Sequence, residues 1–354
     1  MDTLHNKDRF TKNLLAWYDQ HARILPWREN TESYRIWVSE IMLQQTRVEA
    51  VKPYFERFIH ALPTLQDLAN ADEDELKKLW EGLGYYNRIK NMKKCAQICM
   101  KEYGGQLPSS YEQLLSLPGI GSYTAGAIAS IAYKQRVPAV DGNVLRVFSR
   151  VLVSEDDILK EKTKRKFQDI IIEYIPEDRS DAFNQALMEI GALICVPNAS
   201  PKCTICPLAQ DCIGFKTKQA EKLPIKTKKK ARKIENKTII IVVANHKVFI
   251  QKRPKEGVLS GLYEFITLNH HMTKNEVECK IGKSNIKKIM RLQDTKHIFT
   301  HIEWHMRGYL IELKNITEEG LWVSEEDLNN TYAIPTAFKK YKEALEIWWK
   351  AIEN

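Results

Sequence analysis

The spacing of apolar residues changes along this chain, and the change divides it into two kinds of structure. As far as residue 215, apolar residues recur at intervals of three and four, as in helices that pack on one face. From residue 238 the period becomes two, in segments rich in β-branched and aromatic residues, before a helical pattern returns over 337–352. We therefore predict a multidomain fold, with an all-helical part followed by a smaller α+β domain.

Six segments of the first part have helical periodicity. They are residues 33–51, 72–83, 89–103, 123–133, 160–175 and 182–195. Prolines and glycine-containing turns separate them at short intervals, which favours closely connected helices. In the second part, strands are predicted over 238–244, 248–251 and 298–311.

A basic stretch lies between these two parts. Residues 216–237 carry ten basic side chains against two acidic ones, a net charge of +8, whereas the whole 354-residue chain has a net charge of +9. We interpret this stretch as a solvated linker. Whether it only tethers the two parts or also contacts nucleic acid stays open at this point.

The composition excludes several classes of protein. Apolar residues make up 44% of the chain and charged residues 28%, which is ordinary for globular domains and excludes extended disorder. The longest notable apolar run, Ile239–Ala244, is far shorter than the roughly 20 residues that cross a bilayer. The first residues contain no secretory signal, so we expect a cytoplasmic protein with reduced thiols and no membrane partner.

Four of the seven cysteines fall within eighteen residues. Their spacing is Cys195-x7-Cys203-x2-Cys206-x5-Cys212. Four thiolates suit one soft centre, either tetrahedral zinc or an iron–sulfur cluster. Zinc ribbons usually offer two Cys-x2-Cys pairs, and this segment has one, so an iron–sulfur cluster is favoured.

Two glycines bracket one apolar residue just before a predicted helix, in Gly119-Ile120-Gly121. Because glycine has no Cβ, such a turn can bring backbone N–H groups against a phosphate, and the helix N-terminus adds partial positive charge. The turn therefore suits a grip on a nucleic-acid backbone that does not depend on sequence. A plain packing junction between two helices explains the same pattern, so this segment alone leaves both interpretations open.

Further motifs occur in order with the hairpin and the cysteines. They are Leu25-Pro26-Trp27-Arg28, Val38-Ser39-Glu40-Ile41-Met42-Leu43-Gln44-Gln45-Thr46, Gly82-Leu83-Gly84-Tyr85-Tyr86-Asn87-Arg88 and Val140-Asp141-Gly142-Asn143-Val144. With them the chain resembles the helix-hairpin-helix DNA glycosylases related to endonuclease III. Within that group it resembles the MutY-type adenine DNA glycosylases over nearly its whole length. Because the chain carries no signal sequence, we expect a bacterial cytoplasmic protein, associated with the nucleoid.

The resemblance implies a domain plan and a cofactor. Residues 1–215 would form the helical catalytic region, with the hairpin subdomain over about 25–137 and a cluster subdomain from 1–24 and 138–215. Residues 216–237 would be the basic linker, and 238–354 a Nudix-like domain. Cys195, Cys203, Cys206 and Cys212 would hold a 4Fe–4S cluster, and no nucleotide cofactor is expected.

Removing a purine from deoxyribose requires a proton for the departing base and an anion beside a sugar with oxocarbenium character. Two carboxylates in different environments fit this chemistry, and Glu40 and Asp141 are the candidates. Glu40 lies in an apolar helix, where desolvation would raise its pKa. The resemblance assigns Glu40 the protonation of adenine and the activation of water. It assigns Asp141, which could also be a helix N-cap, the stabilisation of the sugar cation, assisted by Asn143 and Tyr123.

Tyr123 also bears on the type of reaction. Bifunctional relatives of endonuclease III place a lysine there, whose amine attacks the sugar and forms a Schiff base. A tyrosine cannot form this adduct, so we predict a monofunctional glycosylase.

The other site residues follow from the resemblance. Adenine stacked in a duplex is inaccessible, so it must be rotated out of the helix. The residues that would line the adenine pocket are Trp27, Arg28, Leu43 and Gln185. Those that would contact DNA are Gln45, Thr46, Tyr85, Gly119 and Gly121. Among them, Gln45 would fill the gap in the base stack and Tyr85 would wedge it.

Lys252-Arg253-Pro254 and Gly261-Leu262-Tyr263-Glu264-Phe265 resemble parts of the Nudix fold. The acidic helix that holds magnesium in active Nudix enzymes is missing, so we expect a domain that recognises 8-oxoguanine. The recognition loop would be Phe299, Thr300 and His301.

An alternative takes residues 297–307 as one strand, with Phe299 exposed and His297, His301 and His305 on one face as a metal site. No nearby cysteine or aspartate completes such a site, so base recognition is favoured.

Two features depart from the family pattern. Seven residues rather than six separate the first two clustered cysteines, and Thr300 stands where serine is usual.

The predicted function is excision of adenine mispaired with 8-oxoguanine or guanine, in base-excision repair, by a monomer that acts on double-stranded DNA. Two alternatives are a non-catalytic iron–sulfur DNA sensor and a glycosylase for thymine or oxidised pyrimidines.

Overall fold

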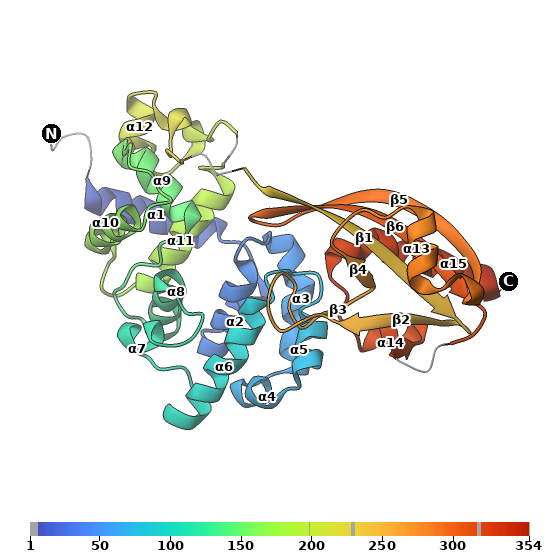
Figure 1. Cartoon of the computed structure of the whole chain (residues 1–354). Coiled ribbons are helices and arrows are strands. Elements are labelled where there is room, and N and C mark those ends of the chain that lie inside the picture. Colours follow the sequence, from blue (N-terminus) through green and yellow to red (C-terminus); the bar gives the residue numbers. More distant parts are fainter. Residues whose placement is uncertain (1–5, 198, 228–230, 317–319, 354) are drawn as a thin grey trace. The chain divides into compact units, whose positions relative to one another are not determined.

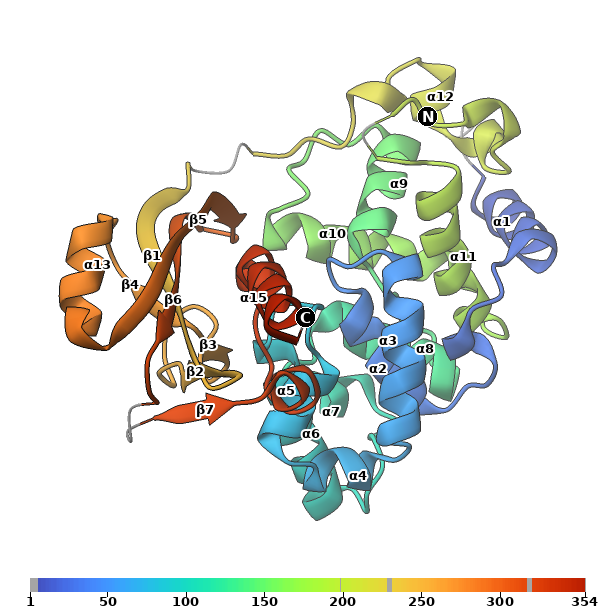
Figure 2. The same ribbon diagram turned by 90° about the vertical axis from the view of Figure 1, so that its right-hand side faces the viewer.

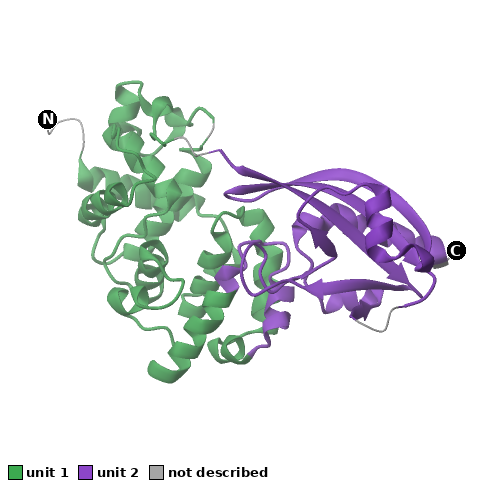
Figure 3. Ribbon diagram, in the orientation of Figure 1, with its two compact units in different colours: residues 1–70, 90–228 green, residues 71–89, 229–354 purple. Residues whose placement is uncertain are grey.

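The structure is a computed structural model that describes residues 6–197, 199–227, 231–316 and 320–353. The chain forms two compact units, residues 1–70 with 90–228 and residues 71–89 with 229–354 (Figure 3). Two predicted features fall partly outside the described residues, namely the linker at 228–230 and the first cysteine gap at Asn198. Within the described ranges, no helix has the length and apolar character needed to cross a membrane.

The first unit is helical (Figure 1). Its α-helices are α1 (Lys7–His21), α2 (Ser33–Leu43), α3 (Val48–Ala61), α4 (Leu65–Asn70), α7 (Tyr111–Leu115), α8 (Ser122–Tyr133), α9 (Gly142–Leu152), α10 (Glu161–Ile171), α11 (Ser180–Leu193) and α12 (Ile213–Lys216). Its short 3₁₀ turns are η1 (Pro26–Arg28), η2 (Ile172–Tyr174), η3 (Cys203–Ile205), η4 (Ala209–Asp211) and η5 (Ala220–Lys222). Helix α6 (Asn87–Glu102) begins in the segment that belongs to the second unit and continues into the first.

The helix predicted over 33–51 is in fact two helices. Helix α2 ends at Leu43 and α3 begins at Val48. Between them Gln45 has a φ of 62°, a left-handed conformation that a right-handed helix cannot contain. The apolar spacing conceals this break because it continues on both sides. The other five predicted helices are present, with ends that differ by up to four residues.

Helix α9 lies at the centre of a core of the first unit. Its buried residues Val144, Val147, Phe148 and Val151 recur every three or four positions, so they share one face. They join a cluster that includes Phe10 of α1 and buried residues of α11. Each such side chain contributes roughly 1.5–3 kcal/mol through burial, which fixes the helix that follows Asp141.

The second unit combines a sheet with helices from two parts of the chain. Its strands are β1 (Lys233–Ala244), β2 (Lys247–Lys252), β3 (Tyr263–Glu264), β4 (Ile266–Leu268), β5 (Ile286–Ile298), β6 (Ile302–Leu313) and β7 (Leu321–Val323). Its helices are α5 (Glu73–Leu79), α13 (Lys274–Ile281), α14 (Glu325–Asn330) and α15 (Lys339–Glu353), with 3₁₀ turns η6 (Lys283–Asn285) and η7 (Thr336–Phe338).

Strand β1 is the middle strand of the order β3-β2-β1-β6-β5. Its odd residues Ile239 and Ile241 pack in the cluster that contains α15, whereas the even residues Ile240 and Val242 pack in the cluster that contains α13 (Figure 2). A strand covered on both faces carries an unbroken apolar run, as this sequence does. β1 begins five residues before its predicted start, because residues 233–237 pair in parallel with β6. The end of the predicted linker is therefore strand.

The strand predicted over 298–311 is interrupted. Strands β5 and β6 form an antiparallel hairpin whose turn is residues 299–301, so 297–307 is not one strand. After the turn, the even residues Trp304 and Met306 are buried as predicted. Before the turn the faces are reversed, because His297, and not Ile298, is paired with Trp304. Ile298, predicted to face the core, is 56% exposed, whereas the Phe299 ring packs with its centroid 4.9 Å from that of Trp304. The single-strand arrangement behind the histidine metal site is wrong.

We predict that Gly126→Ala destabilises the first unit. A Cβ at Gly126 in α8 would lie 2.2 Å from the carbonyl oxygen of Pro138, so α8 and the segment before Asp141 would have to separate. Overpacking of this kind costs roughly 1–3 kcal/mol, measurable by urea unfolding. The control is Gly142→Ala, where a Cβ meets nothing within 4 Å. Equal stability of the two variants would contradict the close approach.

Candidate active site

Glu40 is buried because its helix is apolar on nearly every side. Eight of the eleven residues of α2 are buried, and Glu40 is 5% exposed. Burial raises the pKa of Glu40 to about 7; a hydrogen bond from Tyr123 opposes the rise and the charge of Asp141 adds to it. The side chain therefore holds its proton near neutral pH, as its sequence context predicted.

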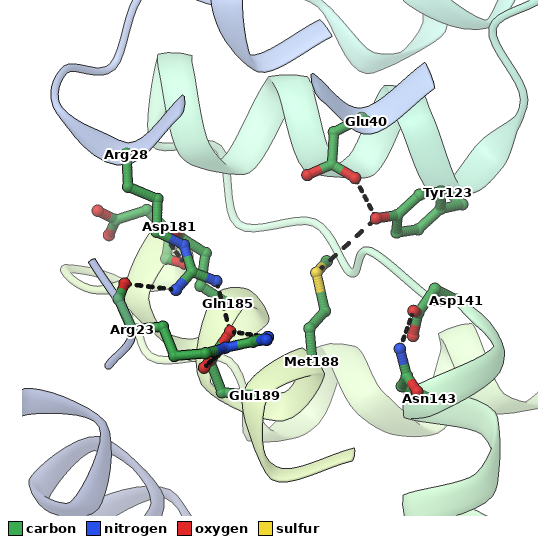
Figure 4. A network of polar contacts seen from close by, with 10 residues as sticks. All are labelled: Arg23, Arg28, Glu40, Tyr123, Asp141, Asn143, Asp181, Gln185, Met188 and Glu189. Carbon is green, nitrogen blue, oxygen red and sulfur yellow. Dashed lines mark hydrogen bonds and ion pairs between the residues drawn. The ribbon is translucent and has the colours of Figure 1, made fainter. Parts of the chain in front are cut away.

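Tyr123 reaches Glu40 from the start of α8, directly after the glycine hairpin. Its hydroxyl donates a hydrogen bond to Glu40 Oε2 and lies 3.8 Å from Met188 Sδ (Figure 4). Burial and the negative charge of Glu40 raise the pKa of Tyr123 well above its usual value. The phenol therefore remains a donor, and it fixes the orientation of the Glu40 carboxyl group.

Asp141 is the N-cap of α9. Its Oδ1 accepts a hydrogen bond from the Val144 N–H at 2.8 Å. Its Oδ2 accepts one from Asn143 Nδ2 at 2.7 Å (Figure 4). Burial raises the pKa of Asp141, and these hydrogen bonds act against the rise by stabilising the carboxylate. The Asn143 amide is oriented in turn by Arg146, whose Nη2 donates to Asn143 Oδ1 at 2.9 Å.

One cavity of about 890 Å³ in the first unit brings most of the predicted residues together. The predicted residues that line it are Trp27, Arg28, Glu40, Leu43, Gln45, Thr46, Gly121, Tyr123, Asp141, Asn143 and Gln185. They come from five separate segments of the chain. A cavity of this size is ample for one nucleotide base, and its polar groups converge on it from opposite walls.

An ion-pair network that was not predicted from the sequence lies in the wall of this cavity. Glu189 of α11 accepts hydrogen bonds from Arg23 Nε at 2.8 Å and from Arg28 Nη2 at 2.9 Å (Figure 4). Its side chain is 1% exposed, so the two guanidinium groups compensate a buried charge. The sequence spacing could have identified Glu189, because it follows the predicted pocket residue Gln185 by four residues and therefore lies on the same face of the helix. Glu189 therefore fixes the position of the Arg28 guanidinium group in the cavity wall.

The hairpin and the α2–α3 turn present backbone at the surface. Gly119 is exposed with a φ of 78°, and a Cβ there would lie 2.8 Å from Asn91 Cβ, so this position requires glycine. Gly121 is exposed and caps α8. Thr46 follows Gln45 in the turn, where its N–H donates to the Leu43 carbonyl at 3.2 Å.

The four clustered cysteines line one small cavity beside α9 and α11. Arg150 Nη1 donates a hydrogen bond to Cys195 Sγ at 3.2 Å. In the described part of the chain, no group of three or more histidine, cysteine or acidic side chains has the spacing of a formed metal site. The thiols nevertheless surround a common space beside a cationic donor, which fits a soft metal cluster.

The remaining predicted residues belong to the second unit. Tyr85 is 49% exposed and has a left-handed φ of 49°. Thr300 and His301 are exposed in the β5–β6 turn, whereas Phe299 is partly buried, contrary to its predicted exposure.

Two family matches cover the two parts of the chain. Residues 38–173 match the family described as HhH-GPD superfamily base excision DNA repair protein, and residues 238–344 match the NUDIX domain. A solved thermostable thymine-DNA glycosylase is 27% identical, with a TM-score of 0.54 over 60% of this chain and 98% of that one. A solved endonuclease III–DNA complex, 23% identical with a TM-score of 0.51, shares the fold. The fold and cavity thus define a helix-hairpin-helix base-excision repair protein with a Nudix-like C-terminal domain.

Curated relatives narrow this class. The adenine DNA glycosylase of Buchnera aphidicola subsp. Schizaphis graminum is 35% identical over 96% of this chain and 98% of its own length. The adenine DNA glycosylase of Homo sapiens is 31% identical over 94% of this chain and 73% of its own length. The chain belongs to the adenine DNA glycosylase family, which confirms the resemblance found in the motifs.

We predict that Glu40→Gln changes how stability depends on pH. The pKa of Glu40 is raised on folding, so its favourable contribution is complete below about pH 4.5 and disappears as the pH rises through about 7. The wild type should lose about 2–3 kcal/mol of unfolding free energy from this group between pH 5 and pH 8, and the variant should not. Urea unfolding across this range measures the difference.

The control for this measurement is Glu56→Gln, at an exposed position on α3. Its pH dependence should follow the wild type. Parallel curves for Glu40→Gln and the wild type would show that Glu40 carries no raised pKa.

Proposed function

We propose that this protein is a monofunctional glycosylase that hydrolyses the N-glycosidic bond of adenine paired with 8-oxoguanine or guanine in double-stranded DNA. The observation that carries the proposal is the buried Glu40 carboxyl group, oriented by Tyr123 in the cavity that also contains Asp141. One acid holds a proton near neutrality, and the other is stabilised as an anion by helix capping. Hydrolysis of a nucleoside requires this pair.

Glu40 acts first, as a general acid. It donates its proton to a ring nitrogen of the extruded adenine while the bond between the sugar C1′ and the base breaks, and the bonding electron pair leaves with the base. Tyr123 stays protonated and orients Glu40 throughout. The resulting Glu40 carboxylate then accepts a proton from the water that attacks C1′, which leaves an abasic site and regenerates the acid.

Asp141 stabilises the positive charge that develops on the sugar. Its hydrogen bonds from Val144 and Asn143 are formed before the reaction, so the carboxylate need not reorganise when the oxocarbenium ion appears. Asn143 is a positioning residue because its amide fixes Asp141 Oδ2. Arg146 extends this support to α11 through a 2.7 Å hydrogen bond from Nη2 to the Gly191 carbonyl.

The residues that would recognise adenine line the wall of the cavity opposite the two acids. Arg28 offers N–H donors, and the Gln185 amide offers both a donor and an acceptor, which together match the mixed edge of adenine. Trp27 and Leu43 provide apolar surface for the ring. Glu189 keeps Arg28 from turning towards a phosphate.

Other residues would bind the DNA without contacting the adenine. The hairpin glycines Gly119 and Gly121 would contact a phosphate, Gln45 and Thr46 would occupy the space that adenine leaves, and Tyr85 would wedge the stack. Thr300 and His301 are accessible for contacts with 8-oxoguanine, with Phe299 supporting the turn.

The four clustered cysteines would hold a 4Fe–4S cluster. Bound there, the cluster would crosslink residues 195–212 and brace this segment against α9 and α11 without entering the hydrolysis. Arg150 contacts the same segment through the carbonyl groups of Cys195 and Val196.

We predict that Glu40→Gln and Asp141→Asn abolish adenine release and preserve DNA binding. Each change removes a charge or proton and keeps the shape of the side chain, so the rate should fall about 10²–10⁴-fold. The measurement is single-turnover release from duplexes with adenine opposite 8-oxoguanine, guanine or thymine, together with a gel-shift assay. A DNA sensor would bind these duplexes without release, and a pyrimidine glycosylase would release thymine instead.

We also predict that sodium borohydride traps no covalent complex of the wild type with its substrate. Tyr123 offers no amine, and a Schiff base needs one. The positive control is Tyr123→Lys, which places an amine in the same wall of the cavity. Lys164 and Lys226 also line this cavity, so trapping of the wild type would identify one of them as a nucleophile and overturn the monofunctional assignment.

A further inference from the structure

The segment 71–89 carries the wedge residue but belongs structurally to the C-terminal unit. It lies inside the stretch 38–173 that matches the glycosylase family, yet it forms one compact body with residues 229–354 (Figure 3). Tyr85 and the recognition turn 299–301 are therefore parts of the same unit. The contacts of α5 explain why.

Asp74 on α5 binds two residues of the C-terminal sheet. Its carboxylate accepts hydrogen bonds from Lys252 Nζ at 2.8 Å and from the Tyr263 hydroxyl at 3.0 Å, and Lys77 of its own helix adds a third at 3.0 Å. Lys252 and Tyr263 are opposite each other in the β2–β3 pairing. Burial alone would raise the pKa of Asp74, but these donors outweigh it and hold the pKa below its usual value.

Lys252 and Tyr263 lie in the two Nudix-like motifs that the proposed hydrolysis leaves without a role. The same strand pair presents Gly261 beside α5, where a Cβ would lie 3.5 Å from Lys77 Nζ. The β2–β3 pair of the Nudix-like fold therefore packs against α5 of the same chain.

Glu81, two residues after α5 ends at Leu79, provides a second attachment. Its Oε1 accepts a hydrogen bond from the Ile334 N–H at 2.8 Å, and its Oε2 accepts one from Lys78 Nζ at 2.7 Å. Lys78 Nζ also donates to the Tyr332 carbonyl at 3.2 Å. Side chains of α5 therefore reach both the β2–β3 pair and the segment that precedes α15.

Hydrogen bonds from Trp80 and Arg88 hold the loop from Glu81 to Tyr85, so this loop moves together with α5. Trp80, fully buried, donates from Nε1 to the Gly84 carbonyl at 3.0 Å. Arg88 Nη2 donates to the carbonyls of Leu83 at 3.0 Å and Gly84 at 3.2 Å, and its guanidinium carbon lies 5.6 Å from the centre of the Tyr85 ring. Displacement of Glu81 would therefore be transmitted to Tyr85.

We propose that Asp74 and Glu81 are positioning residues that couple recognition of the base opposite adenine to extrusion of adenine, because they fasten the wedge Tyr85 to the domain that contains Thr300. The inference rests on the proposed roles of Tyr85 and Thr300. Misplacing the wedge by about 1 Å should slow extrusion about ten- to a hundredfold.

The test uses the full-length protein and a duplex with 2-aminopurine in place of the target adenine, opposite 8-oxoguanine. The fluorescence rise in stopped flow measures extrusion, and single-turnover release from the matching adenine duplex measures the chemical step. We expect Asp74→Ala/Glu81→Ala to slow extrusion about tenfold or more, and Glu81→Gln, which keeps an acceptor for the Ile334 N–H, to remain near the wild type. The control Glu312→Ala, which breaks the ion pair with Lys287 in the same unit, should have no effect.

A double-mutant cycle with Tyr85→Ala separates coupling from general weakening. In the Tyr85→Ala background the α5 changes should cause no further loss, because the wedge is already absent. Equal losses in both backgrounds, or normal extrusion by the double variant, would overturn the proposal. If the double variant is unfolded by circular dichroism, Lys252→Gln removes one attachment while α5 keeps its sequence. If the wild type releases no adenine from any duplex, the proposed function itself fails.

Discussion

The buried carboxyl group of Glu40 is the constraint on which the site depends. A carboxylate inside an apolar helix costs free energy, so the protein keeps the acid protonated and provides Tyr123 as its partner. In the proposed mechanism, the same burial that is unfavourable for folding above neutral pH makes a proton available to the departing base. Surface acids of the chain could not serve this purpose, because water would keep them ionised.

The second acid shows how one residue serves structure and chemistry together. Asp141 caps α9, and capping requires an anionic or polar acceptor at a fixed place. The resulting hydrogen bonds also oppose the rise that burial causes in the pKa of Asp141. The two carboxylates therefore lie in different environments, because Glu40 is surrounded by apolar side chains and Asp141 accepts hydrogen bonds from N–H donors. In the proposed mechanism, this difference rather than the identity of the residues gives them separate tasks.

Much of this arrangement could be predicted from sequence, and the omissions have physical causes. Helical periodicity located the helices, but the break at Gln45 was hidden because apolar spacing continues across it. The strand predicted over 298–311 runs through the turn at 299–301, because alternation in a hairpin resembles alternation in one strand, whereas the resemblance had already predicted a loop at 299–301. Glu189 was overlooked although it shares a helix face with Gln185, because that spacing does not show its long-range ion pairs with Arg23 and Arg28. Membership of 71–89 in the C-terminal unit depends on long-range contacts that no local pattern records.

The most direct test of this account is the pH dependence of the single-turnover rate of adenine release. Because Glu40 must be protonated at the moment of bond cleavage, the rate should be high below neutrality and fall as the pH rises through about 7. It should also fall at low pH, where Asp141 loses its charge. A rate that stays constant from pH 6 to pH 9 would contradict the assignment of Glu40 as the buried proton donor.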